Sequence, residues 1–268
     1  MKKIKLWVTD IDGTIMNYDG SYTPQMANLI QDIQKKGVKF VLATGRMYMG
    51  ADFVAKKFNL DTPIICYQGA MVRHNDKVLW CCDVKKNLAI EIIEYLRAKK
   101  IHTNVYDDNV LYVEDDDKEI MSAYCDNRGT TYVVIDDFMK LPLNNVSKLL
   151  GVINDPNLMQ EVKEDLQKKY EGILTIVQSS ACYLEITDIG ASKGFALEFL
   201  KKYWNLDDDE VLASGDQDND IELLKHAGIR VCVGNNSKKL AQIAQYRAKD
   251  VNSDELVEIV KRFVWDLE

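Results

Sequence analysis

The stretch Ile4-Lys-Leu-Trp-Val-Thr-Asp-Ile-Asp-Gly-Thr14 decides the fold that we expect from this sequence. Its first part, Ile4–Thr9, is almost continuously apolar and ends in Asp10, which is typical of a strand that is buried on both faces. We therefore place this strand at the centre of a parallel sheet.

A helix and a second strand follow. Thr23 can cap, and Pro24 can open, a helix whose apolar residues keep helical spacing until Gly37. Val38–Ala43 is then another apolar strand, and it ends in Thr44. A strand, a helix and a strand at this spacing predict a parallel pair joined by a right-handed crossover.

The same alternation returns towards the C-terminal end. Ser192 can cap a helix that begins at Lys193. Val211–Ser214 is a strand followed by Gly215-Asp216, and Ile229–Val233 is the next strand. Together the two parts predict an α/β fold with a doubly wound, Rossmann-like parallel sheet.

The pattern differs between these two parts. Helical spacing over residues 88–96 precedes short strands around Asn104 and Leu111, and a helix from Pro156 precedes strands at Ile173–Val177 and Cys182–Ile186. We read this middle third as an α/β module inserted into the core. The predicted domains are a catalytic core of residues 1–84 and 188–268 and an inserted cap of residues 85–187.

Composition narrows the possible partners. Hydrophobic residues make up 47% of the 268 residues and charged residues 28%, the balance of an ordinary globular protein. The net charge of -8 argues against a partner such as nucleic acid or an anionic membrane, which needs a positive field. With no apolar run approaching the ~20 residues of a membrane span, and none long enough for a signal peptide, we expect a cytoplasmic protein. The oligomeric state stays open.

The polar residues at the predicted strand ends suggest where chemistry occurs. Ligands of open parallel sheets bind beyond the carboxyl ends of the strands, where the strand order reverses. Asp10, Thr44 and Asp216 each follow an apolar strand, and Lys193 opens a helix that could lie nearby. We expect these side chains to meet at one edge of the sheet.

Clustered carboxylates at that edge predict a cation. Asp10 and Asp12 can face one small volume if the strand breaks after Asp10, and like charges so close either share a proton or recruit a metal. Oxygen ligands at this density suit Mg²⁺, with Asp216 as a third carboxylate. Gly13 frees the backbone for the turn, and Thr14 can tie the turn down.

The turn Gly215-Asp216-Gln217-Asp218-Asn219-Asp220 joins a predicted strand to a helix, where backbone amides and the helix dipole favour an anion. A phosphate group therefore fits nearby. Because acidic residues alone would repel it, the metal and Lys193 must reverse the local charge.

These segments resemble the four motifs of the haloacid dehalogenase superfamily in order and spacing: Asp10-Ile-Asp12-Gly-Thr14, Thr44-Gly45-Arg46, Lys193 and Gly215-Asp216-x-x-Asn219-Asp220. The inserted module and Tyr67-Gln68-Gly69-Ala70 resemble the Cof-like phosphatases, which carry the larger α/β cap. Many of those relatives have Asn where this chain has Gln68. The resemblance implies a Mg²⁺-dependent phosphatase of small phosphorylated metabolites.

The resemblance also implies roles for individual residues. Asp10 would be the nucleophile that forms an aspartyl-phosphate, and Asp12 the general acid and base. Mg²⁺ would be held by Asp10, the main-chain oxygen of Asp12 and Asp216, and the phosphoryl oxygens by Thr44, Lys193 and Asn219. Supporting positions would be Gly13, Thr14, Gly45, Arg46 and Asp220, with Asp220 orienting Lys193 or a metal-bound water. Arg46 could contact the cap or substrate, or anchor the loop after Thr44.

Two other functions share parts of this pattern. A phosphomutase or phosphotransferase of the same fold would use the same aspartyl-phosphate and differ only in the acceptor. A phosphoacceptor signalling module also gathers acids, a Thr and a Lys around an Asp, but it is about half this length and leaves the inserted module unexplained.

Overall fold

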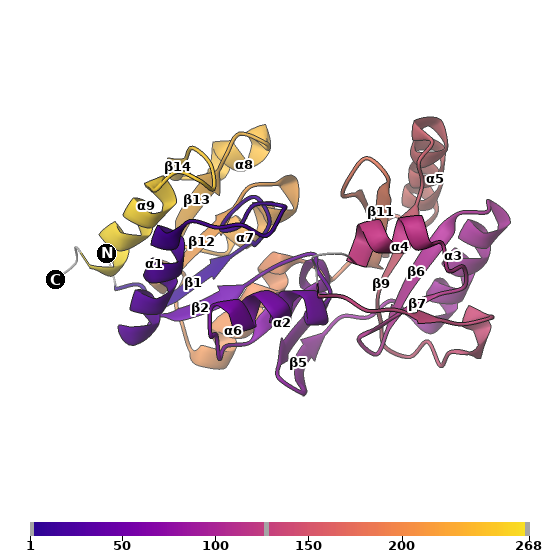
Figure 1. Cartoon of the computed structure of the whole chain (residues 1–268), viewed down its shortest axis with the longest axis horizontal. Helices are drawn as coiled ribbons and strands as arrows, with labels where there is room; N and C mark the ends of the chain where they lie inside the picture. Colours follow the sequence, from indigo (N-terminus) through magenta and orange to yellow (C-terminus); the bar gives the residue numbers. More distant parts are fainter. Residues whose placement is uncertain (1–2, 126–128, 266–268) are drawn as a thin grey trace. The chain divides into compact units, whose positions relative to one another are not determined.

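The computed structural model describes residues 3–125 and 129–265. The chain divides into two compact units, unit 1 (Met1–Trp80 with Ser192–Glu268) and unit 2 (Cys81–Ala191). Figure 1 shows the elements of each. The interpretation of the two parts as a catalytic core and a cap stays a prediction.

Unit 1 is built on a parallel five-stranded sheet. Its strand order is β14-β13-β12-β1-β2, and every pair in it is parallel. The strands are β14 (Tyr246–Ala248), β13 (Ile229–Val233), β12 (Val211–Gly215), β1 (Leu6–Thr9) and β2 (Lys39–Leu42). From β1 the chain winds one way to β2, and from β12 it winds the other way to β13 and β14, so the order reverses between β1 and β12. The predicted α/β class and doubly wound sheet are confirmed.

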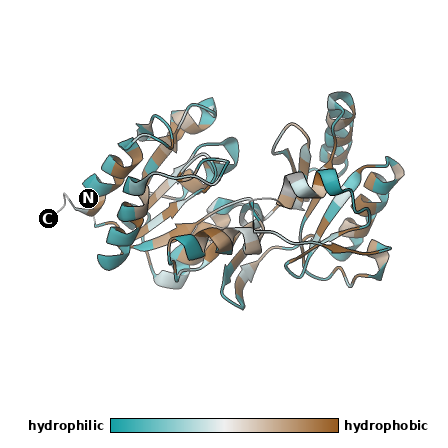
Figure 2. Cartoon of the chain, in the orientation of Figure 1, coloured by the Kyte–Doolittle hydropathy of each residue, from teal (hydrophilic) through white to brown (hydrophobic). Residues whose placement is uncertain are grey.

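Helices cover this sheet because their apolar faces match it (Figure 2). Leu197 of α6 and Leu224 of α7 pack in one buried cluster with Val8 of β1. α1 begins as its sequence predicts, since Pro24 opens it and the Thr23 side chain accepts a hydrogen bond from the Met26 amide. The unit 1 helices are α1 (Pro24–Lys35), α2 (Tyr48–Lys57), α6 (Lys193–Trp204), α7 (Ile221–Lys225), α8 (Lys238–Ile243) and α9 (Glu255–Val264), with short turns η3 (Asp208–Glu210) and η4 (Asp218–Asp220).

A second, three-stranded sheet of unit 1 was not predicted. Its order is β3-β4-β5, formed by β3 (Ile64–Cys66), β4 (Met71–His74) and β5 (Lys77–Cys81). A tight turn, η1 (Tyr67–Gly69), joins β3 to β4. Ile65 also bridges to Ala43 just after β2, which brings this turn to the carboxyl end of the parallel sheet.

Unit 2 is a six-stranded sheet with helices. The strand order is β10-β11-β9-β6-β7-β8, formed by β10 (Leu174–Gln178), β11 (Tyr183–Asp188), β9 (Val146–Val152), β6 (His102–Asp107), β7 (Val110–Val113) and β8 (Val133–Val134). Apolar residues of α3 (Lys86–Ala98) and α5 (Pro156–Lys169) pack against it, and α4 (Lys118–Cys125) and η2 (Phe138–Lys140) complete the unit. Among the described residues, no helix combines the length and the apolar character that spanning a bilayer requires.

Candidate active site

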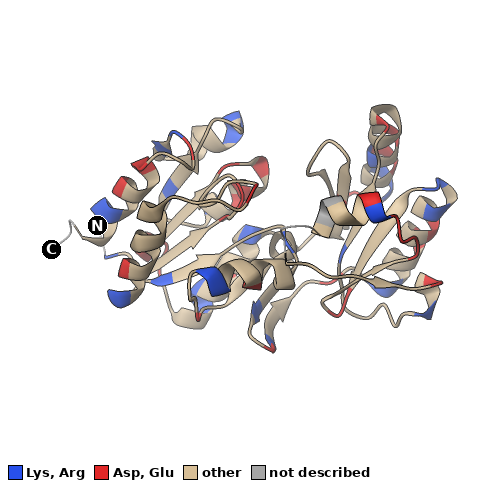
Figure 3. Cartoon of the chain, viewed as in Figure 1, with Lys and Arg blue, Asp and Glu red and all other residues tan. Residues whose placement is uncertain are grey.

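The strand ends of unit 1 bring the predicted residues to one edge. Asp10 directly follows β1 and Asp216 directly follows β12, and these two strands are parallel neighbours, with Thr9 opposite Ser214. Thr44 lies two residues after β2, on the other side of β1. The site therefore sits where the strand order reverses, and acidic residues gather there along the segment from β12 to α7 (Figure 3).

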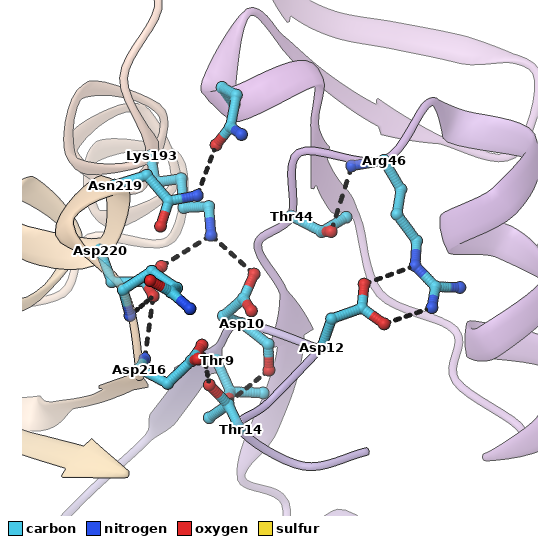
Figure 4. A network of polar contacts seen from close by, with 12 residues as sticks. Thr9, Asp10, Asp12, Thr14, Thr44, Arg46, Lys193, Asp216, Asn219 and Asp220 are labelled. Atoms are coloured by element: carbon cyan, nitrogen blue, oxygen red, sulfur yellow. Dashed lines mark hydrogen bonds and ion pairs between the residues drawn. The ribbon is translucent and has the colours of Figure 1, made fainter. Parts of the chain in front are cut away.

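Lys193 is the cation at the centre of this edge (Figure 4). Its side chain is 0% exposed, and Nζ lies 2.6 Å from Oδ1 of Asp10 and 2.6 Å from Oδ1 of Asp220. Lys193 is the first residue of α6, whose cap Ser192 accepts hydrogen bonds from the amides of Gly194 and Phe195. Burial strengthens the attraction within both ion pairs because water does not screen the charges, although removing the charges from water also costs free energy.

Asp220 is fully engaged by the protein. Besides the contact of Oδ1 with Lys193, Oδ2 accepts hydrogen bonds from the backbone amides of Asp216 (3.0 Å) and Gln217 (3.2 Å). This carboxylate therefore fixes the Lys193 ammonium and the turn after β12 at the same time.

Asp216 is held by two neutral side chains. Oδ1 accepts a hydrogen bond from Oγ1 of Thr14 at 3.2 Å, and Oδ2 accepts one from Nδ2 of Asn236 at 3.1 Å. Gly13 lies against it with φ +84°, and a Cβ there would sit 2.4 Å from Oδ2 of Asp216. Only glycine permits both this backbone conformation and this approach. Thr14 thus ties the first motif to Asp216.

The electrostatics of the cluster favour recruiting a positive charge. Burial raises the pKa of Asp10 well above its usual range, the Lys193 charge opposes this, and the charges of Asp220 and Asp216 add to it. Burial, with the charge of Asp220, also raises the pKa of Asp216 to about 6. For Lys193, burial lowers the pKa, but the charges of Asp10 and Asp220 together outweigh this and raise it.

The donor set fits Mg²⁺. One carboxylate oxygen from each of Asp10, Asp216 and Asp220 lies within 4.8 Å of the others, and all three residues are buried. Among the described residues, Oδ2 of Asp10 receives no hydrogen bond, whereas both oxygens of Asp220 are occupied. Asp10 therefore has an oxygen ready for a cation, and the partners of Asp216 are neutral side chains, whereas Asp220 is already paired with the Lys193 ammonium. Hard oxygen donors such as those of Asp10 and Asp216 are what Mg²⁺ prefers.

Asp12 does not join this cluster. Its carboxylate instead binds the guanidinium of Arg46, with Nε at 2.7 Å from Oδ2 and Nη2 at 2.5 Å from Oδ1. Figure 4 shows the pair on the far side of Asp10 from Asp216. The expectation that both carboxylates of the first motif face one small volume is wrong, because only Asp10 belongs to the cluster and a bidentate guanidinium holds the carboxylate of Asp12.

The remaining predicted residues lie around the same edge. Thr44 is buried, and its Oγ1 accepts a hydrogen bond from the Arg46 amide at 3.2 Å. Asn219, in η4, is exposed and donates from Nδ2 to Oε1 of Gln68 at 2.9 Å. Gly45 packs against the same Gln68 side chain, since a Cβ on it would lie 2.4 Å from Nε2.

The contacts that Asn236 and Gln68 make with predicted site residues were also missed from the sequence. Asn236 lies just beyond β13, so its place after the next parallel strand was a usable signal. The bond between Gln68 and Asn219 joins residues 151 positions apart and left no local pattern.

Comparison with known sequences gives the family. A family model described as "haloacid dehalogenase-like hydrolase" matches residues 7–260. A 5-amino-6-(5-phospho-D-ribitylamino)uracil phosphatase of Bacillus subtilis is 25% identical over 263 residues, covering 95% of both chains. A phosphatase of Escherichia coli with the same substrate name is 23% identical over 262 residues, covering 97% of this chain and 96% of its own.

Solved structures agree on the fold. A haloacid dehalogenase-like hydrolase from Bacteroides thetaiotaomicron superposes with a TM-score of 0.88 at 24% identity, covering 97% of this chain and 99% of its own. A crystal structure from Thermotoga maritima has a TM-score of 0.86 at 28% identity and covers 97% of both chains.

Proposed function

The chain belongs to the haloacid dehalogenase-like hydrolases, and from this premise we propose that it is a Mg²⁺-dependent phosphatase that attacks small phosphate monoesters with Asp10. One observation carries the proposal: the buried Lys193 ammonium bridges Asp10 and Asp220 beside Asp216, at the reversal point of the sheet. Such a site offers a nucleophile, a phosphate-binding cation and metal ligands within one small volume.

In the first step, a carboxylate oxygen of Asp10 attacks phosphorus, and the bond from phosphorus to the ester oxygen breaks. The leaving oxygen takes a proton from Asp12 and departs as an alcohol. The product is an aspartyl-phosphate on Asp10. Because both oxygens of Asp12 accept hydrogen bonds from Arg46, at 2.7 and 2.5 Å, Asp12 must leave that partner and take up a proton before it can act as the acid.

In the second step, water attacks the phosphorus of the aspartyl-phosphate. Asp12, now a carboxylate, takes a proton from the water, and the bond from Asp10 to phosphorus breaks. Inorganic phosphate leaves and the Asp10 carboxylate is restored, so Asp12 ends the cycle with the proton it needs for the next substrate.

Asp10, Asp216 and the main-chain oxygen of Asp12 would hold Mg²⁺. When bound, the ion neutralises the charge of the phosphoryl group and the repulsion within the carboxylate cluster. Thr44, Lys193 and Asn219 would bind the phosphoryl oxygens, and Asp220 would keep the Lys193 ammonium in place. Phosphoryl transfer depends mainly on such positioning and charge neutralisation.

The substrate class is a small phosphorylated metabolite. The relatives named as 5-amino-6-(5-phospho-D-ribitylamino)uracil phosphatases support a primary phosphate ester on a small metabolite. Sugar phosphates, flavin mononucleotide and pyridoxal phosphate belong to the same chemical class. Unit 2, which falls within the sequence between the second and third motifs, would be the cap that selects among them.

A screen of phosphorylated metabolites with Mg²⁺ tests the proposal. We expect the wild-type protein to release inorganic phosphate, Asp10→Asn to fall to background, and Asp12→Asn to lose about 10²- to 10⁴-fold. Near-wild-type activity of Asp10→Asn would contradict the nucleophile assignment. An isomeric sugar phosphate formed without free phosphate would instead indicate a mutase, and an acyl phosphate that persists for minutes without ester turnover would indicate a signalling module.

A further inference from the structure

The turn between β3 and β4 has an unusual backbone. Tyr67, Gln68 and Gly69 have φ values of 53°, 59° and 93°, so three consecutive residues adopt the left-handed region. Two of them are not glycine, and each non-glycine residue there costs of order 1 kcal/mol. Strain of this kind persists only where surrounding contacts impose it, and it is frequent at functional sites.

Contacts with two of the site segments impose this conformation. The Tyr67 amide donates to the Arg46 carbonyl at 2.9 Å, and the Gln68 amide donates to the Thr44 carbonyl at 3.1 Å. Gly69 lies directly on the start of α6, where a Cβ would sit 2.2 Å from the carbonyl carbon of Ser192. The turn is therefore fixed to the segment after β2 and to the helix that begins with Lys193.

The side chain of Gln68 extends this link to a third segment. Its amide packs on Gly45, and Oε1 accepts a hydrogen bond from Nδ2 of Asn219 at 2.9 Å. A side-chain amide has a donor end and an acceptor end, and its partner decides which end faces which way. Because Oε1 of Gln68 is an acceptor, the side-chain nitrogen of Asn219 faces Gln68. The second N–H of that nitrogen remains for another acceptor.

We propose that Gln68 is a positioning residue for phosphate binding, which sets the amide of Asn219 so that it presents an N–H and not its oxygen to the phosphoryl group. This rests on the proposed function, in which Asn219 binds a phosphoryl oxygen. The reversed amide would place an oxygen against phosphoryl oxygens, where two acceptors repel each other. The strained turn fixes the backbone that carries Gln68, and Nε2 of Gln68 lies against Gly45, so Oε1 is the end that faces Asn219.

Binding of inorganic phosphate in the presence of Mg²⁺, measured by calorimetry, tests this role. Gln68→Met keeps the length and the packing on Gly45 but removes the acceptor, and we expect the Kd to rise about three- to tenfold, as for loss of one hydrogen bond. In an Asn219→Ala background the same substitution should change the Kd less than about twofold, because the group it acts through is gone.

Two further variants keep the test decisive. Gly45→Ala would place a Cβ 2.4 Å from Nε2 of Gln68 and displace that side chain, so it should reproduce the loss and the coupling even if Gln68→Met folds poorly. Gln34→Met makes the same chemical change in α1, where Gln34 donates to the Ile30 carbonyl, and should leave the Kd unchanged.

The outcomes separate this inference from the proposed function. Additive effects of Gln68→Met and Asn219→Ala, or a Gln68→Met protein that binds phosphate like wild type, would overturn the positioning role while phosphatase activity stands. A wild-type protein that binds no phosphate and hydrolyses no ester would overturn the proposed function, and the inference with it.

Discussion

The guanidinium of Arg46 binds the carboxylate of Asp12 through two parallel hydrogen bonds, at 2.7 and 2.5 Å. The Arg46 side chain is 11% exposed and that of Asp12 24%, so the pair is largely shielded from water. Two bonds from one planar group fix both the position and the rotation of the carboxylate. In the proposed reaction, Arg46 therefore sets the place from which Asp12 moves to the leaving oxygen.

Replacing Arg46 should impair proton transfer more than phosphate binding. We expect Arg46→Ala to lower kcat by about 10- to 100-fold for an alkyl phosphate, a part of the usual contribution of general acid catalysis. The loss should be smaller for p-nitrophenyl phosphate, whose leaving group needs little protonation. Steady-state kinetics on both substrates check this, and equal losses on the two would contradict a role through Asp12.

Removing the Lys193 ammonium should destabilise the fold as well as stop turnover. Lys193→Met leaves Asp10 and Asp220 buried without their cation, and breaking a buried pair in this way costs about 3 to 5 kcal/mol. Urea unfolding of Lys193→Met and of Lys193→Met/Asp220→Asn measures the effect. The double variant should regain part of the stability and none of the activity; a return of activity would show that Lys193 has only a structural role.

Asp216→Asn should weaken the dependence on Mg²⁺. The amide keeps an oxygen but loses the charge, so we expect at least a tenfold rise in the Mg²⁺ concentration that gives half-maximal activity, since a lost charge–charge contact exceeds about 1.4 kcal/mol. Chelation of Mg²⁺ should abolish the activity of the wild-type enzyme. A Mg²⁺ titration of Asp216→Asn that overlays that of the wild type would remove Asp216 from the metal site.

The same substitution should stabilise the metal-free protein, in a pH-dependent way. The pKa of Asp216 in the folded protein is about 6, above the usual 3.8, so the folded state binds the extra proton between these values. The contribution of Asp216 to the stability of the wild type therefore falls as pH rises from about 4 to about 6. Asn has no such proton to lose, so at pH 7 the free energy of unfolding of Asp216→Asn should exceed that of the wild type by roughly 2 to 3 kcal/mol as an upper estimate.

Unfolding free energies in EDTA at pH 4 and pH 7 measure the difference. Asp218→Asn, at an exposed carboxylate two residues away, is the matched control and should show no such pH-dependent gain. If Asp216→Asn stabilises the protein equally at both pH values, the pKa of the Asp216 carboxyl is not raised in the folded state.

The parallel sheet was predictable because its strands are continuous apolar runs closed by polar residues. β1, β2 and β12 each end within two residues of Asp10, Thr44 or Asp216, and one rule about strand ends then places these side chains together. β9 of unit 2 was missed, although all seven of its residues are buried. Its sequence contains Lys148 and Gly151 and shows neither alternation nor an unbroken apolar run, so nothing local distinguishes it.

Side-chain pairings were less predictable than strand ends. The bond from Arg46 to Asp12 depends on which of several nearby carboxylates the guanidinium reaches, and the spacing of 34 residues contains no such information. The left-handed turn at Tyr67–Gly69 was equally hidden, because only the third of its residues is a glycine.

The pairing of β1 with β12 also constrains the order in which the protein folds during its synthesis. Leu6 of β1 pairs with Val211 of β12, so β1 has no partner on that side while the ribosome makes the intervening segments. Unit 2, one continuous stretch from Cys81 to Ala191, is complete before β12 emerges. Pairings so distant in sequence form slowly and leave apolar edges exposed meanwhile. The carboxylate cluster therefore assembles only late in synthesis, and a chain cut short before Asp216 would carry Asp10 without the other two carboxylates.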